Sequence, residues 1–317
     1  MTQFPTLSVV APVYNEAGNI IALVQEIETV LKNYPSFWEI ILIDDGSTDH
    51  SRSEIQQVKE KSPHVISLFL KRNFGQTAAL SAGIDASQGE VIITMDADRQ
   101  NDPADIPLLL NKLAEGYDVV SGWRKKRKDH FLTRTLPSQL ANKLISFFTG
   151  VTLNDYGCSL KAYTRETLSS FRLYGEMHRF LPALCTWRGA KVAEIPVNHR
   201  PRTQGVSKYG LNRIFRVLLD LLTVKFLLEY STKPMRVFGT TGFICSGLGI
   251  AISLYLTALK LFAHENIGQR PLLFLGILLI IVGLQLIMLG LISELLVRIY
   301  YESQSKTTYQ IDASKPR

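Results

Sequence analysis

Two long uncharged stretches near the C-terminus constrain this chain more than any other feature of its sequence. Each contains 23 residues, Val237 to Leu259 and Pro271 to Ser293. At 1.5 Å per residue, a helix of this length spans roughly 35 Å, which exceeds the ~30 Å hydrocarbon core of a bilayer. Core helices of soluble proteins rarely run this long without a charge, so a membrane hairpin is favoured over a buried one.

Basic residues flank the expected hairpin and predict its orientation. Residues 1–200 carry 22 Lys and Arg against 22 Asp and Glu, so the whole excess of +7 lies in the last 117 residues. The basic flanking residues are Arg202, Lys208, Arg213, Arg216, Lys225, Lys233, Arg236, Arg298, Lys306, Lys315 and Arg317. By the positive-inside rule, both flanks and the N-terminal domain are expected on the cytoplasmic side of the inner membrane of the cell. This charge distribution indicates a membrane surface or an anionic ligand, with no nucleic acid as partner.

The N-terminus and the cysteines fit a cytoplasmic location. The first residues lack a basic segment followed by an apolar one, so no cleavable signal is expected. Cys158, Cys185 and Cys245 are odd in number and widely spaced, which predicts reduced thiols rather than a disulfide framework or a metal site.

The first 200 residues alternate between apolar strand-like runs and helical patterns. The runs lie at 7–11, 39–43, 65–70, 91–95 and 117–121, and the helical patterns include 19–31, 76–86 and 104–113. Continuous apolar strands alternating with helices predict an α/β, Rossmann-like fold with a mostly parallel sheet covered on both faces. Such sheets bind ligands at the carboxyl ends of their strands.

Three polar clusters follow strands of this predicted sheet. They are Pro12-Val-Tyr-Asn-Glu16, Asp44-Asp45-Gly-Ser-Thr-Asp49 and Asp96-Ala97-Asp98-Arg99-Gln100. Residues 47–49 also fit a helix cap, and both interpretations stay open. Carboxylates at positions i and i+2 can project toward one hard cation, so Asp96 and Asp98, with Gln100, are candidate ligands for Mg²⁺ or Mn²⁺ bound to phosphates.

Two common nucleotide-binding patterns do not occur in the first 200 residues. A dinucleotide-binding fold needs Gly-X-Gly-X-X-Gly after its first strand, and a P-loop needs Gly-X₄-Gly-Lys. Their absence from the sequence leaves a nucleotide sugar or another nucleotidyl compound as the expected substrate, held through metal and base contacts.

Six motifs occur in a fixed order along the chain. They are Pro12-Val-Tyr-Asn-Glu16, Asp44-Asp45-Gly-Ser, Arg72-Asn-Phe-Gly-Gln, Gly89-Glu90, Asp96-Ala-Asp with Gln100, and Arg202-X₂-Gly205-X-Ser207-Lys208-Tyr209. Together they resemble the GT-A glycosyltransferases of family 2, and more narrowly the polyisoprenyl-phosphate glycosyltransferases. The two spans at the C-terminus are similar to those of the bactoprenol glucosyltransferase branch. One departure is Asn101, which stands before Asp102-Pro103 where the family pattern commonly runs directly into Asp-Pro.

The resemblance implies a reaction and a set of contacts. The reaction is an inverting transfer of a hexose, glucose from UDP-glucose, to a polyprenyl phosphate such as undecaprenyl phosphate; a GDP-mannose-dependent mannosyltransferase, similar to dolichyl-phosphate mannosyltransferase, is the alternative. By similarity, the residues that bind the nucleotide sugar are Pro12, Tyr14, Glu16, Asp44, Asp45, Asp96, Ala97, Asp98 and Arg124.

The acceptor is an anion, so basic residues are expected to bind it. The candidates for the lipid phosphate are Arg134, Arg200, Arg202 and Lys208, together with Ser207. Arg124 follows a strand end, and its planar fork also suits a phosphate. Lys125 to Lys128 fit a solvated loop or attraction to lipid headgroups.

Asp155 is the candidate catalytic residue. It lies where related glycosyltransferases carry an acidic residue near the acceptor, and a turn-forming Asn-Asp pair is the other interpretation.

The predicted organisation has four parts. They are a GT-A domain over 1–207, an amphipathic juxtamembrane helix over 208–234, a membrane hairpin over 235–300 with helices at about 237–260 and 271–295, and a cytoplasmic tail over 301–317. The stretch 131–149 is also amphipathic, and both such helices fit either the headgroup layer or a core. Gly276, Gly283 and Gly290 lie on one helix face, which predicts a homo-oligomer.

Three other functions share parts of this pattern. A processive polysaccharide synthase usually carries Gln-X-X-Arg-Trp and more spans, and this sequence has no such motif. A GT-A enzyme with another membrane acceptor is disfavoured by the motif at 202–209. A non-enzymatic membrane scaffold would be expected to have lost Asp96, Asp98 or Lys208, and all three are present.

Overall fold

The computed structural model describes residues 5–125, 145–146, 150–169, 173, 177–201, 233–264, 266–268 and 270–303. The chain forms two compact units, Met1–Val224 and Lys225–Arg317. The first unit contains a seven-stranded sheet in the order β3-β2-β1-β4-β6-β5-β7. Its strands are β1 (Leu7–Val13), β2 (Trp38–Asp44), β3 (Val65–Phe69), β4 (Val91–Thr94), β5 (Val119–Trp123), β6 (Lys161–Thr164) and β7 (Val192–Pro196).

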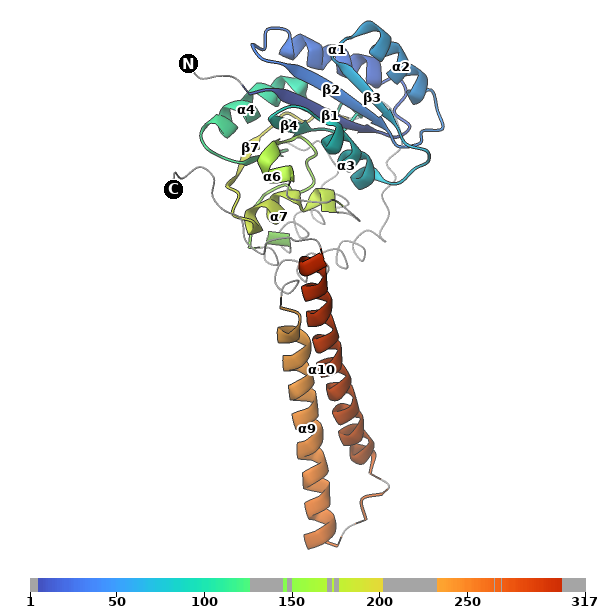
Figure 1. Cartoon of the computed structure of the whole chain (residues 1–317), viewed down its shortest axis with the longest axis vertical. Helices are drawn as coiled ribbons and strands as arrows, with labels where there is room; N and C mark the ends of the chain where they lie inside the picture. The colour runs from blue at the N-terminus through green and yellow to red at the C-terminus, as the bar shows by residue number, and fades with distance from the viewer. Residues whose placement is uncertain are drawn as a thin grey trace. The chain divides into compact units, whose positions relative to one another are not determined.

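Helices cover both faces of this sheet (Figure 1). They are α1 (Ile20–Leu31), α2 (Ser51–Lys61), α3 (Gln76–Ala86), α4 (Ile106–Ala114), α6 (Arg165–Ser169) and α7 (Leu181–Trp187), with 3₁₀ turns η1 (Pro103–Asp105) and η3 (Met177–Arg179). Successive strand residues point to opposite faces, so Val9 packs in a core with α1, α2 and α4, and Val10 packs in a second core with α3, α6 and α7. The predicted α/β fold is confirmed.

One strand departs from the parallel arrangement. β6 lies between β4 and β5 and runs antiparallel to both, whereas β1–β2, β1–β4, β2–β3 and β5–β7 are parallel pairs. Its first residue, Lys161, therefore pairs with Thr94, the last residue of β4. Because β6 runs antiparallel to both neighbours, its amino end lies at the edge of the sheet where β4 and β5 have their carboxyl ends. Lys161 consequently lies at the edge that carries the polar clusters.

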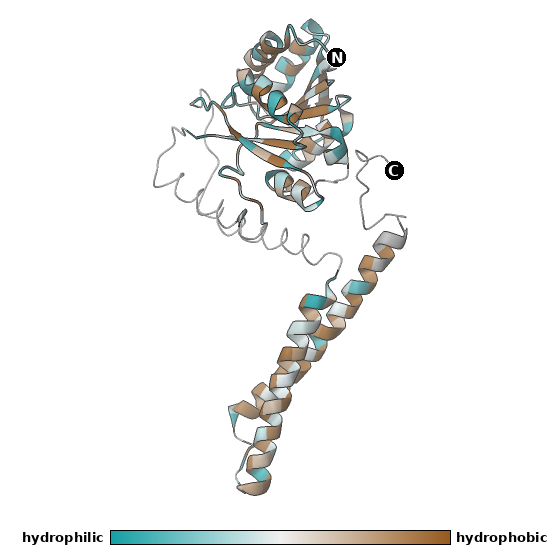
Figure 2. Cartoon of the chain, turned by 90° about the vertical axis from the view of Figure 1, so that its left-hand side faces the viewer, coloured by the Kyte–Doolittle hydropathy of each residue, from teal (hydrophilic) through white to brown (hydrophobic). Residues whose placement is uncertain are grey.

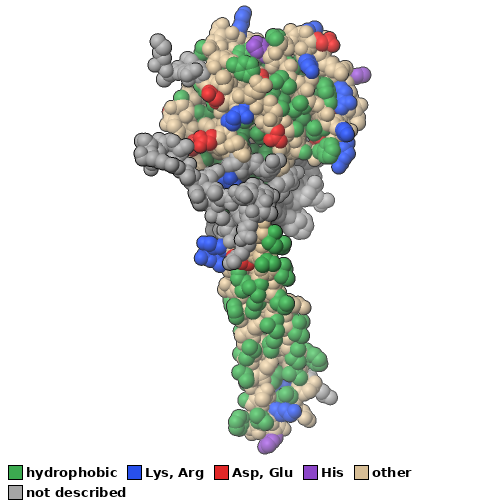
Figure 3. All heavy atoms as spheres, viewed as in Figure 1, with side chains coloured by type: hydrophobic (Ala, Val, Ile, Leu, Met, Phe, Trp, Pro, Cys, Tyr) green, Lys and Arg blue, Asp and Glu red, His purple; other side chains and the backbone are tan. Residues whose placement is uncertain are grey.

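The second unit contains two long helices, α9 (Met235–Phe262) and α10 (Pro271–Ser303). Both are long and apolar enough to cross a membrane, and only 17% and 11% of their apolar windows are buried. A core helix of a soluble protein would be mostly buried. Most residues of both helices are instead hydrophobic (Figure 2), and many of their hydrophobic side chains lie on the visible surface (Figure 3). This exposure indicates a membrane protein, as the uncharged stretches predicted.

Glycines bring α9 and α10 together. A Cβ on Gly242 would lie 2.6 Å from the carbonyl oxygen of Gly283, and a Cβ on Gly249 would lie 2.6 Å from that of Gly276. Gly290 faces the Cβ atom of Phe238, which would lie 3.1 Å from an added Cβ. The glycine face of α10 thus packs within the chain, which gives the seven-residue spacing a role inside the hairpin. Homo-oligomerisation stays a prediction.

Several predicted segments lie almost entirely outside the described residues. They are the amphipathic stretches at 131–149 and 208–234 and the tail at 301–317.

Candidate functional site

The loops after β1 and β2 are joined by hydrogen bonds. The backbone N–H of Asn15 donates to Ser47 Oγ at 3.0 Å, and the N–H of Thr48 donates back to Asn15 Oδ1 at 2.8 Å. Asp49 accepts from the N–H of Ala17 at 3.1 Å and from the N–H of Ser51, the first residue of α2, at 2.9 Å. Residues 47–49 therefore connect the two loops to each other and to the start of α2. This role is similar to the helix cap that the sequence allowed.

The predicted nucleotide contacts of the first cluster lie along the end of β1. Pro12 lines a cleft at the carboxyl edge of the sheet. The side chain of Tyr14 is 36% exposed. Glu16 Oε2 accepts from Asn19 Nδ2 at 2.8 Å. Their binding roles stay predictions.

Asp44 and Asp45 are buried, with 0% and 3% of their surface exposed. Asp44 accepts two hydrogen bonds from the guanidinium of Arg52, at 2.9 and 3.1 Å, and one from the N–H of Ser47 at 3.0 Å. Asp45 accepts from the N–H groups of Phe74 and Gly75 at 2.7 and 3.0 Å. Both carboxylates are thus engaged by the protein, and Asp45 holds the turn that precedes α3.

The cluster after β4 is arranged differently. Asp96 and Asp98 are partly exposed on either side of the buried Ala97. Asp96 Oδ1 accepts from Gln76 Nε2 at 2.8 Å, and Asp98 Oδ1 accepts from the backbone N–H of Gln100 at 3.1 Å. Asp96 lines the cleft at this edge, and Asp98 follows it two residues later.

The acidic pair fits a metal that is shared with a ligand. Among the described residues, no group of three or more His, Cys, Asp or Glu side chains is placed to hold a metal ion by itself. Mg²⁺ is usually held by one or two carboxylates and completed by phosphate oxygens and water, rather than by a cage of protein ligands. Asp96 and Asp98 provide such a partial set of hard oxygen ligands, with Gln100 beside them.

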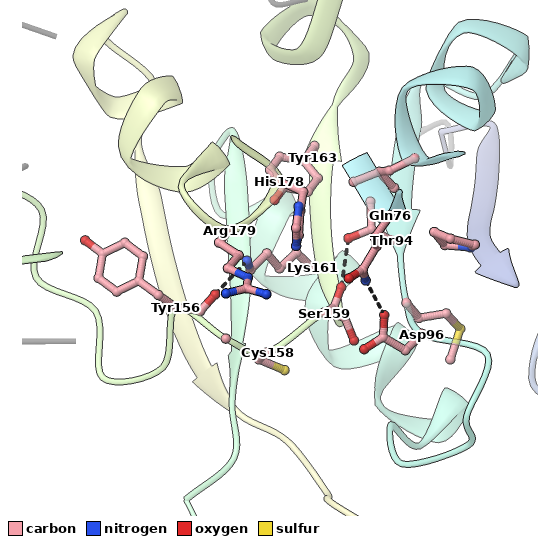
Figure 4. A pocket seen from close by; sticks show the side chains of 14 residues that line it. Gln76, Thr94, Asp96, Tyr156, Cys158, Ser159, Lys161, Tyr163, His178 and Arg179 are labelled. Atoms are coloured by element: carbon pink, nitrogen blue, oxygen red, sulfur yellow. Dashed lines mark hydrogen bonds between the residues drawn. The ribbon is translucent and has the colours of Figure 1, made fainter. Parts of the chain in front are cut away.

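A cleft next to Asp96 is lined by side chains from several elements of the sheet and its helices (Figure 4). It contains about 620 Å³ of non-protein space, including its open mouth. Its lining comes from the ends of β1 and β4, the start of α3, β6 with the segment before it, and the turn η3. The polar side chains labelled in Figure 4 are Gln76, Thr94, Asp96, Tyr156, Ser159, Lys161, Tyr163, His178 and Arg179.

Lys161 is a lining residue that the sequence reasoning missed. Its side chain is 3% exposed, and its Nζ donates to the carbonyl oxygen of Tyr156 at 3.2 Å. Burial lowers the pKa of the Lys161 ammonium to about 8. A charged residue within the strand-like run at 160–163 was the available signal, because buried lysines are rare without a partner.

His178 lies beside Lys161 in the same cleft. Its Nδ1 atom and Thr77 Oγ1 share a hydrogen bond of 2.6 Å. Burial, with the nearby charges of Arg179 and Lys161, lowers the pKa of His178 to about 3, so the imidazole is neutral at neutral pH. This part of the cleft has a positive electrostatic environment.

Arg124 and Asp155 form a buried ion pair. The guanidinium donates from Nε to Asp155 Oδ2 at 2.7 Å and from a terminal nitrogen to Oδ1 at 3.0 Å. Asp155 is 1% exposed. Burial opposes the charge of Arg124, but hydrogen bonds to Asp155 raise its pKa above the ordinary value. The candidate catalytic carboxylate therefore holds Arg124 in a fixed orientation.

Arg200 lies in a separate ion-pair network. Its guanidinium contacts Glu26 Oε2 at 2.6 Å and Asp102 Oδ1 at 2.7 Å. Arg99, with a positive φ of 60°, also donates to Glu26, at 2.6 Å. Arg200 does not line the cleft of Asp96 among the described residues, and its charge is already matched by two carboxylates.

The remaining predicted lipid-phosphate residues lie outside the described residues. They are Arg134, Arg202, Ser207 and Lys208.

A family model described as Glycosyl transferase family 2 matches residues 8–171. Two relatives align with nearly the whole chain. A dodecaprenyl-phosphate galacturonate synthase of Rhizobium johnstonii is 42% identical over 307 residues, covering 96% of this chain and 91% of that protein. An undecaprenyl-phosphate 4-deoxy-4-formamido-L-arabinose transferase of Shewanella sediminis is 38% identical over 307 residues, with the same coverage of 96% and 91%.

A solved structure shares the fold of the first unit. It is glucosyl-3-phosphoglycerate synthase of Mycobacterium tuberculosis in complex with Mn²⁺ and UDP-glucose. The TM-score is 0.55 at 20% identity, and the match covers 70% of this chain and 79% of that chain. This likeness confirms the predicted GT-A fold.

Proposed function

The chain belongs to glycosyl transferase family 2, and from that premise we propose that it transfers a sugar from a nucleotide sugar to a polyprenyl phosphate. The observation that carries the proposal is the 42% identity, over 96% of the chain, to a protein that uses a polyprenyl phosphate. A cleft with a partly exposed acidic pair at the carboxyl edge of an α/β sheet supports it. The resemblance to family 2 drawn from the six motifs is confirmed, and the chain is a glycosyltransferase.

The proposed reaction is a single displacement at the sugar. A phosphate oxygen of the lipid attacks C1, the bond from C1 to the nucleotide diphosphate breaks, and the diphosphate leaves with the bonding electrons. The configuration at C1 inverts. A lipid phosphate is already ionised at neutral pH, so its orientation matters more than its deprotonation.

Asp96 and Asp98 would hold Mg²⁺ or Mn²⁺, with Gln100 as a further ligand. When bound, this metal offsets the charge that develops on the departing diphosphate. The hydrogen bond from Gln76 fixes one oxygen of Asp96 and so orients its carboxylate. Pro12, Tyr14 and Glu16 would contact the nucleotide from the end of β1.

Arg124 would bind a phosphate group of the donor or of the lipid. Its ion pair with Asp155 fixes the plane of the guanidinium, and N–H groups of an arginine fork suit phosphate oxygens. In this proposal Asp155 acts as a positioning residue for Arg124. Arg134, Arg202, Ser207 and Lys208 would add contacts to the lipid phosphate.

The hairpin would place this enzyme at the membrane that contains its acceptor. We propose that both ends of the hairpin lie on the cytoplasmic side, because basic residues flank both ends and such residues are enriched on that side of a membrane. A protease added to sealed inverted membrane vesicles should then remove a C-terminal tag, whereas intact spheroplasts should protect it. Protection in the vesicles would contradict this orientation.

The most direct test supplies a panel of donors. Membranes containing the full chain are incubated with polyprenyl phosphate, Mg²⁺ or Mn²⁺, and labelled UDP- and GDP-sugars that include glucose, mannose, galactose and galacturonate. We expect label in the lipid fraction, and none after EDTA or without polyprenyl phosphate. Folded protein that labels no lipid from any donor would refute the proposed function. The panel also tests the UDP-glucose expected from the sequence against the galacturonate of the relative from Rhizobium johnstonii.

A further inference from the structure

Lys161 is a buried cation without a carboxylate partner in the described part of the chain. Its side chain is 3% exposed, and among the described residues its ammonium group donates to one backbone carbonyl, that of Tyr156. Leaving an ammonium group buried without a counter-charge is costly. By contrast, Arg124 in the same region is neutralised by Asp155. The free-energy cost of burying the Lys161 ammonium is offset when a bound ligand supplies a negative charge beside it.

The surroundings of Lys161 also favour an anion. Among the residues that line the cleft, Lys161 and Arg179 are cationic and Asp96 is the acidic one. His178, between these charges, is kept neutral. Figure 4 shows Lys161, His178 and Arg179 in one part of the cleft and Asp96 with Gln76 in another. The cleft therefore has an acidic end suited to a metal and a basic end suited to an anionic group.

The geometry points to a nucleotide hexuronate as donor, with Lys161 binding the carboxylate of the sugar. This inference rests on the proposed function and deepens it. The diphosphate of the donor would bind at the acidic end of the cleft, through the metal at Asp96 and Asp98, and the sugar would lie toward Lys161. A neutral hexose would then give the Lys161 ammonium no carboxylate to hydrogen-bond, whereas the carboxylate at C6 of a hexuronate supplies one through a charge-assisted hydrogen bond. The galacturonate used by the relative from Rhizobium johnstonii carries such a carboxylate.

Strand pairing makes Lys161 suitable for discrimination between sugars. Its backbone pairs with Thr94 of β4 on one side and with Ser121 of β5 on the other. The carbonyl of Tyr156 fixes the end of the side chain. A buried polar group that is left unpaired by the wrong substrate gives stronger rejection than a difference in apolar contact.

The experiment compares UDP-galacturonate with UDP-galactose, which differ at C6 by a carboxylate in place of a hydroxymethyl group. The full chain in lipid nanodiscs is assayed with polyprenyl phosphate and Mg²⁺ or Mn²⁺, and kcat/KM is measured for both donors. We expect wild type to prefer the uronate by about 100-fold, the scale of one hydrogen bond to a buried charge.

Lys161→Met keeps the length of the side chain and removes its charge. We expect it to lower kcat/KM for UDP-galacturonate by about 100-fold and to change that for UDP-galactose by less than about threefold. Lys112→Met is the matched control, because Lys112 lies on α4 and pairs with Glu115 away from the cleft. It should leave both values unchanged.

Each other outcome overturns a specific claim. Equal losses for both donors in Lys161→Met would assign Lys161 to the diphosphate or to folding and would overturn the inference. If that variant does not fold, the preference of wild type decides, and transfer of neutral sugars without a preference for the uronate overturns the inference while leaving the proposed function. Absence of transfer from every donor in the panel contradicts the proposed function itself.

Discussion

The acidic residues at the end of β2 and those at the end of β4 stand at the same edge of one sheet but bond differently. Asp44 and Asp45 are buried and accept hydrogen bonds from Arg52 and from backbone N–H groups. Asp96 and Asp98 are partly exposed, and Asp96 lines a cleft. Strand-end carboxylates therefore differ within one sheet: one pair is bonded inside the loops, and the other stays partly exposed, where we propose that it holds a metal.

Replacing Asp96 should give the largest effect on activity. Asp96→Asn keeps the shape of the side chain and removes its charge, so we expect sugar transfer to fall by about 1,000-fold, the scale of losing one charged group that acts in the transition state. The free energy of unfolding should stay within about 0.5 kcal/mol of wild type, because the side chain is partly exposed. Rates come from lipid labelling, and stability comes from urea denaturation in detergent.

The control for this prediction is Asp85→Asn, an exposed residue of α3. It should alter neither quantity. A large loss of stability in Asp96→Asn would mean that the two strand ends do not differ as described.

Replacing Asp45 should have the opposite profile. Asp45→Asn puts an amide group opposite the N–H groups of Phe74 and Gly75, so one of these donors loses its acceptor beside a buried side chain. We expect the free energy of unfolding to fall by about 3 to 4 kcal/mol, the scale of disrupting a buried charged network. Denaturation curves measure the loss. Unchanged stability with lost activity would instead assign Asp45 to the substrate, as its sequence context predicted.

Lys161 should make stability depend on pH in a direction that reveals its unmatched charge. Its pKa is lowered from 10.5 to about 8 by burial, so between pH 8 and 10.5 the unfolded chain binds more protons than the folded chain. The stability of wild type relative to Lys161→Met should therefore rise by about 3 kcal/mol as the pH increases through this window. Unfolding curves at pH 7.5 and 10.5 measure the difference. A difference that does not change with pH would show that the ammonium is matched within the protein.

Replacing Arg52 should give the smallest of these effects. Arg52→Met removes the partner of the buried Asp44, but Arg52 is 49% exposed and Asp44 keeps the N–H of Ser47. We expect a loss of about 2 kcal/mol in the free energy of unfolding, less than for Asp45→Asn because water can approach the vacated position. Thermal unfolding of the two variants side by side checks the order. A larger loss than that of Asp45→Asn would reverse it.

The sequence predicted the first five strands, the acidic cluster after β4 and the two long apolar helices, because each depends on local pattern. It did not distinguish Asp44 and Asp45 from Asp96 and Asp98. That distinction depends on amide groups at Phe74 and Gly75, far along the chain. Local composition carries no information about such pairing.

The charged residue in the strand-like run at 160–163 was a signal, but the place of Lys161 in the sheet could not be read from the sequence for a related reason. β6 has four residues and pairs with β4, which lies about 70 residues earlier, and with β5. A short strand that contains a lysine does not match the apolar pattern of the other strands. Its neighbours in the sheet, rather than its own residues, determine that it is a buried strand.

The antiparallel placement of β6 has a consequence for the rigidity of the cleft. A side chain on a loop must lose backbone freedom when it closes on a ligand, at a cost of roughly 1–2 kcal/mol per residue ordered. Lys161 is held by strands on both sides, so that entropy is already lost when the chain folds. One wall of the cleft is therefore pre-organised before any ligand binds.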